Sequence, residues 1–252
     1  MDIFEYMRNS NMEKESPLAS RLRPSTLEEV VGQKHIIGND KLLYRAIKED
    51  KISSVIFYGP PGTGKTTLAK VIANTTSADF KQINATIANK KDMEEVVEGA
   101  KAALGMYSKK TILFIDEIHR FNKSQQDYLL PFVEDGTLIL IGATTENPYF
   151  EVNNALISRS IIFELKPLGQ EDIKELVYRA VNDEKKGMGA YKAEIDEDAA
   201  QFLSDVSGGD ARMALNAVEL GILTSVRSED GIIHITLEVA EQCIQKRAAR
   251  YD

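Results

Sequence analysis

Five short apolar runs recur between residues 54 and 165, most of them separated by longer segments with a different spacing of apolar positions. The runs occupy residues 54–59, 80–85, 111–116, 138–145 and 160–165. Each run is short and continuous, which is typical of a strand buried on both faces. Segments long enough to form helices separate most of these runs, at residues 64–76, 91–104 and 123–134. Strands that alternate with helices predict an α/β fold with a five-stranded parallel sheet flanked by helices.

The pattern changes after residue 167, where strand signals nearly stop and helical spacing dominates. One helical face is lined by Ile173, Leu176, Val177, Ala180 and Val181. Further helices are predicted over 196–207, 211–226 and 237–247. We therefore expect an α/β domain over residues 17–167 and a small all-helical domain over residues 168–252. The polar residues 1–16 are expected to form a mobile arm.

Two shorter helices are expected before the first strand. Residues 39–50 place Leu42, Leu43, Ala46 and Ile47 on one helical face. Residues 25–30 are expected to form a short helix, for which Ser25 or Thr26 could serve as the N-cap.

The composition is that of a globular protein. Hydrophobic residues make up 43% of the 252 positions, and no apolar run reaches the roughly 18 residues of a membrane span, so no membrane association is expected. The single cysteine, Cys243, cannot form an internal disulfide, which fits a reducing cytoplasm. The net charge of −8 does not suit a protein that coats nucleic acid through bulk charge. Contact with nucleic acid would need a local patch or a ring of several copies.

The stretch GPPGTGKTT, residues 59–67, matches the phosphate-binding loop pattern and lies between a predicted strand and a predicted helix. Glycines let successive backbone N–H groups point inward, and the following helix directs its positive end at an anion. Lys65 would reach the β- and γ-phosphates, and the Thr66 hydroxyl would bind Mg²⁺. The predicted phosphate-binding residues are Gly59, Pro60, Pro61, Gly62, Thr63, Gly64, Lys65, Thr66 and Thr67.

A pair of carboxylates supplies the second element of the predicted site. Asp116 and Glu117 follow the apolar run 112–115, and ligands of parallel sheets bind at such strand ends. Asp116 would hold Mg²⁺, and Glu117 would act as the base that polarises a water. The alternative is a pair of solvated acids. His119 could couple to the site or could simply be packed or solvated.

These motifs, with the small helical domain, resemble the AAA+ ATPases. Residues 142–148, GATTENP, resemble the sensor 1 segment. The resemblance implies that Thr145 senses the γ-phosphate or orients water, with Thr144 as the near alternative. Residues 153–159, NNALISR, resemble the segment with the arginine finger, which implies that Arg159 acts on a neighbouring subunit. A surface salt bridge is the alternative for Arg159.

Three further segments extend the resemblance. Residues 207–212, SGGDAR, resemble sensor 2, which implies that Arg212 contacts phosphate from the lid, with a surface salt bridge as the alternative. Residues 22–33, LRPSTLEEVVGQ, resemble the adenine-side segment of clamp loaders. That segment implies contact with the base by Arg23, Pro24 and Val31. Asn84 is implied to be the polar residue that restrains Glu117 until ligands arrive.

Residues 17 to about 250 resemble more closely one branch, the RarA/MgsA family of replication-associated recombination ATPases. The resemblance implies ATP and Mg²⁺ as cofactors and DNA-stimulated hydrolysis at stalled forks or gaps. It also implies single-strand-binding protein as a partner, a homo-oligomer, and a cytoplasmic, nucleoid-associated location. The family continues into a C-terminal oligomerisation region, whereas this chain stops at QKRAARYD, so a truncated chain is expected. ATP rather than GTP also rests on the resemblance.

DNA contact has a candidate segment in residues 120–126, RFNKSQQ. Arg120 and Lys123 are basic, and Phe121 could stack on a base. Alternatively, Phe121 docks the loop onto the sheet and the two cations are solvated. Three other functions stay open: a clamp-loader subunit, a Holliday-junction motor, and a nucleotide-dependent interaction module with incidental turnover.

Overall fold

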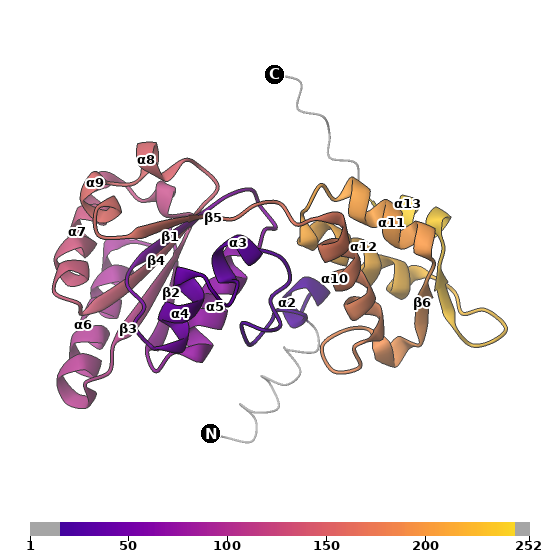
Figure 1. Ribbon diagram of the computed structural model, residues 1–252, viewed down its shortest axis with the longest axis horizontal. Helices are drawn as coiled ribbons and strands as arrows, with labels where there is room; N and C mark the ends of the chain where they lie inside the picture. The colour runs from indigo at the N-terminus through magenta and orange to yellow at the C-terminus, as the bar shows by residue number, and fades with distance from the viewer. Residues whose placement is uncertain (1–15, 245–252) are drawn as a thin grey trace. The chain divides into compact units, whose positions relative to one another are not determined.

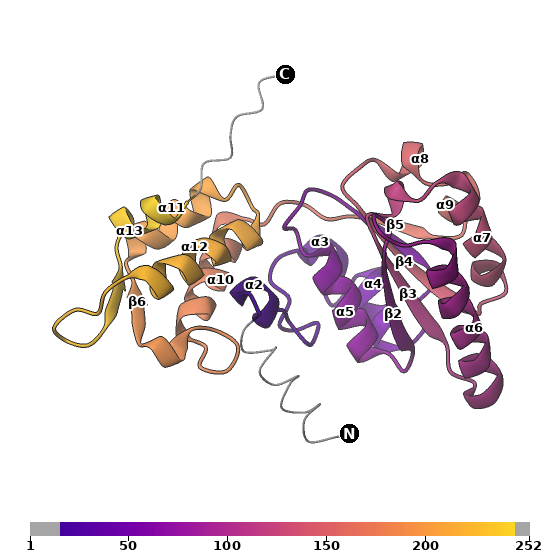
Figure 2. The same ribbon diagram turned by 180° about the vertical axis from the view of Figure 1, so that it is seen from behind.

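A computed structural model describes residues 16–244, which form two compact units (Figures 1 and 2). The α/β unit comprises residues 24–166. The helical unit comprises, of the described residues, 16–23 and 167–244. The chain therefore crosses between the units twice. The arm predicted over residues 1–16 lies almost wholly outside the described residues. The helix predicted over residues 237–247 lies partly outside them.

The α/β unit is built on a five-stranded parallel sheet, as predicted, with the strand order β2-β3-β4-β1-β5. The strands are β1 (Val55–Tyr58), β2 (Asp79–Asn84), β3 (Thr111–Asp116), β4 (Leu138–Thr144) and β5 (Ile161–Glu164). Every residue of β4 is buried, because this strand lies in the middle of the sheet under helices on both faces. The carboxyl ends of all five strands meet at one edge.

Helices cover both faces of this sheet (Figures 1 and 2). Alternate residues of a strand point to opposite faces, so Phe57 belongs to the apolar core on one face of the sheet and Ile56 to the core on the other face. The helices of this unit are α3 (Lys34–Ile37), α4 (Leu42–Lys48), α5 (Lys65–Thr75), α6 (Lys90–Tyr107), α7 (Lys123–Glu134), α8 (Pro148–Glu151), α9 (Asn154–Ile157) and the 3-10 helix η1 (Ile118–Arg120).

The two predicted N-terminal helices differ from the structure. The predicted helix over 25–30 is wrong: the residues form turns in which the Ser25 N–H donates to the Glu29 carboxylate at 2.7 Å. Six residues are too few to offset helix nucleation without strong packing, and only Leu27 is fully buried there. The helix expected over 39–50 begins later, at Leu42.

The helical unit packs its helices around one core. The elements are α2 (Leu18–Arg21), α10 (Gln170–Asn182), the 3-10 helix η2 (Gly189–Tyr191), β6 (Ala193–Ile195), α11 (Glu197–Val206), α12 (Ala211–Thr224), β7 (Ile233–Ile235) and α13 (Leu237–Cys243). Leu18 and Leu22 belong to this core, so residues 17–23 join the helical unit rather than the α/β domain in which they were predicted.

The helical unit also contains a small sheet that the sequence analysis did not find. Strands β6 and β7 pair in parallel, with Ala193 opposite Ile233 and Ile195 opposite Ile235. Each of these strands has three residues, with one polar position between two apolar ones. Such a segment is too short to show the period of two that marks a strand, so the unit was expected to be all-helical. Between residues 16 and 244, no helix combines the length and the apolar character that crossing a membrane would demand.

Candidate active site

The phosphate-binding loop leaves the sheet at Gly59, directly after β1. Gly59 has a φ of +148°, and a Cβ there would lie 2.1 Å from the carbonyl oxygen of Leu165, so only glycine fits. The Gly59 N–H donates to the Thr144 carbonyl at 3.2 Å, which joins the start of the loop to the end of β4. Burial, and then the Glu164 carboxylate, raise the pKa of Tyr58, which precedes the loop, so its hydroxyl stays protonated at neutral pH.

Lys65 is the first residue of α5 and places its ammonium within the loop. The Lys65 Nζ donates to the carbonyl oxygens of Gly59 and Pro60, both at 2.7 Å, and the residue is only 8% exposed. The Thr63 hydroxyl donates to the Pro60 carbonyl at 2.9 Å and braces the same turn. A buried cation surrounded by the loop backbone can neutralise a bound phosphate. Thr66 lies beside it, half-buried in the first turn of α5.

The predicted carboxylates lie at the same edge of the sheet. Asp116 is the last residue of β3 and lies opposite Asn84, the last residue of β2. Glu117 follows with a φ of +56°, a left-handed conformation that is uncommon for a residue with a side chain, and η1 begins after it. The Asn84 Oδ1 accepts hydrogen bonds from the N–H and the hydroxyl of Thr86, at 2.9 and 2.7 Å. The Glu117 carboxylate instead faces His119.

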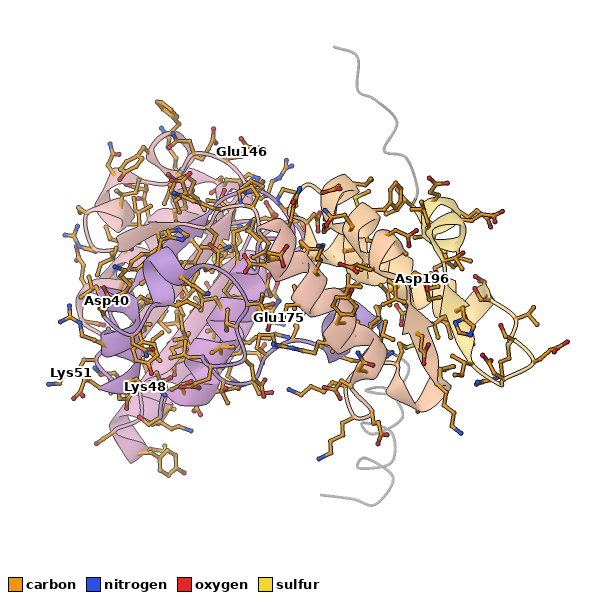
Figure 3. The ribbon with its side chains drawn as sticks, turned by 45° about the vertical axis from the view of Figure 1, so that its right-hand side comes forward. Asp40, Lys48, Lys51, Glu146, Glu175 and Asp196 are labelled. Atoms are coloured by element: carbon orange, nitrogen blue, oxygen red, sulfur yellow. The ribbon has the colours of Figure 1, made fainter. Side chains whose placement is uncertain are left out.

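His119 connects Glu117 to β4. The His119 Nδ1 lies 3.3 Å from the Glu117 Oε2 and 2.8 Å from the Thr144 Oγ1. Thr144 is completely buried, whereas Thr145 is exposed in the loop that follows β4, the loop that also holds Glu146 (Figure 3). Thr144 and Thr145 therefore have different settings: Thr144 bonds within the protein, and Thr145 is open to solvent.

The residues present fit Mg²⁺ and a polyphosphate. Mg²⁺ usually binds through one or two protein oxygens, with waters and substrate phosphates completing its octahedron. Asp116 and Thr66 offer a carboxylate and a hydroxyl of this kind, and the Lys65 ammonium offers the charge that a phosphate needs. Residues 16–244 contain no cluster of three or more acidic, histidine or cysteine side chains that could hold a metal ion.

Arg159 lies away from these strand ends, just after α9. Its guanidinium forms an ion pair with Glu134 at 2.5 Å and donates to the Ala155 carbonyl at 2.9 Å, and the side chain is 40% exposed. Glu134 is the last residue of α7, so the pair fixes the arginine on the surface of the α/β unit. Arg159 also donates to the Ser158 hydroxyl at 2.9 Å, so three groups of the α/β unit hold a guanidinium that is still partly exposed.

Arg212 belongs to the helical unit, where it occupies the first turn of α12. Asp210 caps this helix, because its Oδ1 accepts from the N–H groups of Arg212 and Met213, at 3.0 and 3.3 Å. The Arg212 side chain is exposed. The cap fixes the backbone from which this side chain extends.

The comparisons with known proteins agree with this geometry. Residues 22–158 match the family described as the Holliday junction DNA helicase RuvB P-loop domain, and residues 189–252 match the AAA C-terminal domain. Replication-associated recombination protein A of Bacillus subtilis is 49% identical over 236 residues, which are 94% of this chain and 55% of that protein. The Escherichia coli K12 protein of the same name is 42% identical, again over 94% of this chain and 53% of its own length.

The chain belongs to the AAA+ family of replication-associated recombination protein A. The chain spans about half the length of the curated relatives it matches. ATPase WRNIP1 of Dictyostelium discoideum is 40% identical over 219 residues, 87% of this chain and 25% of that protein. The solved Holliday junction branch migration motor RuvB of Thermotoga maritima is 27% identical and has a TM-score of 0.69, covering 88% of this chain and 72% of that one. These matches confirm the predicted AAA+ fold.

The segment 22–33, which is expected at the adenine, also contains a residue that was not among the predicted ones. Val31 is half-buried and is followed by Gly32 and Gln33, both with positive φ. The Gln33 Nε2 donates to the carbonyls of Thr63, at 3.2 Å, and Lys166, at 2.7 Å, and its Oε1 accepts from the Lys166 N–H at 3.1 Å. One amide therefore ties the phosphate-binding loop to the end of the α/β unit. The sequence signal for this role was a glutamine directly after a glycine, at residues 32–33.

The residues that follow Lys166 are held by contacts within the helical unit. The Leu168 N–H donates to the Gly209 carbonyl at 3.2 Å. Gly209 has a φ of +83°, and a Cβ there would lie 2.6 Å from the Cβ of Pro167. Lys166 is thus hydrogen-bonded to Gln33 within the α/β unit, and Leu168 is hydrogen-bonded to Gly209 within the helical unit. Arg23 and Pro24, predicted at the adenine, occupy the other crossing between the units.

The candidate DNA segment is only partly suited to that role. Phe121 is 3% exposed and packs in the same apolar core as Ile56, so the stacking interpretation is wrong and the docking alternative is confirmed. The ring belongs to the same buried apolar cluster as Ile118 and Leu129, so it is closed to an incoming base. Arg120 and Lys123 are exposed on either side of it.

Proposed function

We propose that this protein hydrolyses ATP at a contact between copies of the chain and that DNA at stalled or gapped forks stimulates the reaction. The observation that carries the proposal is the placement of Lys65, Asp116 and Glu117 at one sheet edge. The family relationship supports an ATPase in replication-associated recombination. Homo-oligomerisation, binding of single-strand-binding protein and a cytoplasmic, nucleoid-associated location belong to the same proposal.

In this proposal each residue has one task. Lys65 neutralises charge on the β- and γ-phosphates, and Thr66 and Asp116 hold Mg²⁺, which withdraws charge from the phosphate oxygens when bound. Glu117 accepts the proton of the attacking water. Thr145 orients that water or senses the γ-phosphate. Arg159 reaches the γ-phosphate of a neighbouring copy, and Arg212 neutralises phosphate from the same copy. Arg23, Pro24 and Val31 lie against the adenine.

Two variants test the site. Lys65→Ala should weaken ATP binding by about 100-fold or more. In the proposal the substitution removes at least two charge-assisted hydrogen bonds to the phosphates, each worth about 1.5–3 kcal/mol. Glu117→Gln should keep binding near wild type and reduce turnover by about 100-fold or more, since it removes the base but keeps the shape. Fluorescent-nucleotide titration and phosphate release measure the two quantities. Tight ATP binding by Lys65→Ala would overturn the assignment of the loop.

The DNA proposal is tested by the same phosphate-release assay with single-stranded, forked, gapped and fully duplex DNA. Forked or gapped DNA should give the largest stimulation. Reversing the charges of Arg120 and Lys123 together should reduce that stimulation and leave the DNA-free rate unchanged. Reversal of Lys185 and Lys186, a basic pair in the helical unit, is the matched control. Equal turnover with and without every DNA would exclude a DNA-dependent ATPase.

A further inference from the structure

A buried polar contact next to Glu117 has no task in the proposed reaction. The His119 side chain is 8% exposed and lies between the Glu117 carboxylate and the Thr144 hydroxyl. Its neighbours in sequence, Ile118 and Phe121, are 0% and 3% exposed, so the turn that carries it is anchored in the core on both sides. A ring fixed in this way cannot move far, which suits a residue that positions another one.

The contact has two alternative hydrogen-bond arrangements. When the His119 Nδ1 carries a proton, it can donate to the Glu117 carboxylate or to the Thr144 Oγ1. When the Nδ1 is bare, it accepts from the Thr144 hydroxyl and has no hydrogen bond to offer the carboxylate. The Thr144 Oγ1 also accepts from the Glu146 N–H at 3.0 Å, which holds the hydroxyl in place. Only in the first arrangement can the His119 ring hold the Glu117 carboxylate by a hydrogen bond.

The same threonine reaches the phosphate-binding loop through its backbone. The Thr144 carbonyl accepts from the Gly59 N–H at 3.2 Å, while its side chain contacts His119 at 2.8 Å. A continuous path therefore leads from the first residue of the loop, through Thr144 and His119, to the Glu117 carboxylate. Asn84, by contrast, has its side-chain oxygen engaged by Thr86.

We propose that His119 is the positioning residue of Glu117 and that Thr144 sets the orientation of the His119 ring. The inference rests on the proposed function, in which Glu117 is the base for ATP hydrolysis. His119 touches neither the nucleotide nor the water; it acts by directing the carboxylate. Thr144 lies at the end of β4 and accepts a hydrogen bond from the Gly59 N–H. The orientation of the Glu117 carboxylate therefore depends on the end of this strand and on the start of the phosphate-binding loop.

The test separates turnover from nucleotide binding. His119→Ala should lower kcat by about 10- to 100-fold, the size expected when a base is displaced by about 1 Å, and should leave KM within about two-fold. His119→Asn keeps a donor near the place of Nδ1 and should recover most of kcat. Thr144→Val should lower kcat in the same direction, and Thr144→Ser should restore it. His234→Ala, which changes a half-buried histidine of the helical unit, is the matched control.

A double variant distinguishes this inference from the proposed function. If His119 acts through Glu117, then His119→Ala should cause no further loss in the Glu117→Gln background. Wild-type kcat in His119→Ala, an additive loss in the double variant, or a loss explained by KM would each overturn the inference. Unchanged turnover in Glu117→Gln alone would instead overturn the proposed base. Thermal melts identify any variant that loses activity by unfolding, and Thr144→Ser then carries the test.

Discussion

The α/β unit and the helical unit hold their functional side chains in different ways. In the α/β unit, Gly59 and Glu117 directly follow strands β1 and β3 and both have positive φ, as does Gln33 before α3. In the helical unit, Arg212 extends from the first turn of a regular, capped helix. The α/β unit therefore depends on unusual backbone conformations, and the helical unit depends on its packed core to present a side chain.

The difference teaches where substitutions should act. A change at a polar, partly exposed site residue of the α/β unit alters chemistry with little effect on folding, because polar partners rather than apolar burial define the position. A change in the helical core alters stability first. Three substitutions, from the largest effect to the smallest, test this contrast.

Arg159→Ala should reduce ATP hydrolysis by about 1,000-fold in the assembled protein and leave nucleotide affinity unchanged, since a trans-acting arginine stabilises charge that develops only in the transition state. Phosphate release and nucleotide titration provide the measurements. The control is Arg179→Ala in the helical unit, where the arginine pairs with Glu175 at 2.6 Å. If both variants turn over equally fast, Arg159 is a surface salt bridge like Arg179.

Leu18→Ala should destabilise the helical unit by about 3 kcal/mol, within the usual range for a buried leucine, because Leu18 is completely buried in that unit's core. Hydrogen exchange should then show lower protection in α12 than in β3 and β4. Leu42→Ala, at a 53% exposed position, is the control and should change little. Equal loss of protection in both units would mean that residues 17–23 do not belong to the helical unit alone.

His234→Gln should give the smallest effect, and one that depends on pH. The hydrogen bond to Asp230 raises the pKa of His234 above 6.5, and the Ile232 N–H and then His234 lower the pKa of Asp230 below 3.8. The histidine therefore stabilises the fold below its unfolded pKa and loses that effect as the pH rises through its folded pKa. The difference in Tm between wild type and variant should be larger near about pH 5.5 than near about pH 8. An equal difference at both values would contradict the pair.

Most of the fold could be predicted from the sequence because its strands are buried on both faces. The run TILFID coincides with β3, residues 111–116, and the segment 123–134 coincides with α7. Helix α7 begins where Asn122 and Gln125 form a capping box, a signal that is local in sequence. Strands β6 and β7 and the position of α2 could not be predicted, since they depend on contacts between residues far apart in the chain.

The site could be predicted as a set of residues but not as a set of contacts. Lys65, Asp116 and Glu117 lie together because their motifs fix both the strand end and the residue type. The contact of Glu117 is a different matter: its carboxylate lies beside His119, whose coupling to the site the sequence had left open, and the role of Asn84 stays a prediction. Which polar group meets a carboxylate depends on a turn with a left-handed residue, and sequence spacing does not encode that geometry.

Both crossings between the units end in proline, at Arg23–Pro24 and at Lys166–Pro167. Proline fixes its own φ and confines the preceding residue to extended conformations. The two connections therefore have fewer accessible backbone conformations than connections without proline, and Lys166 and Leu168 in the second are also hydrogen-bonded to Gln33 and Gly209. Less conformational entropy is therefore lost when these connections become ordered on folding.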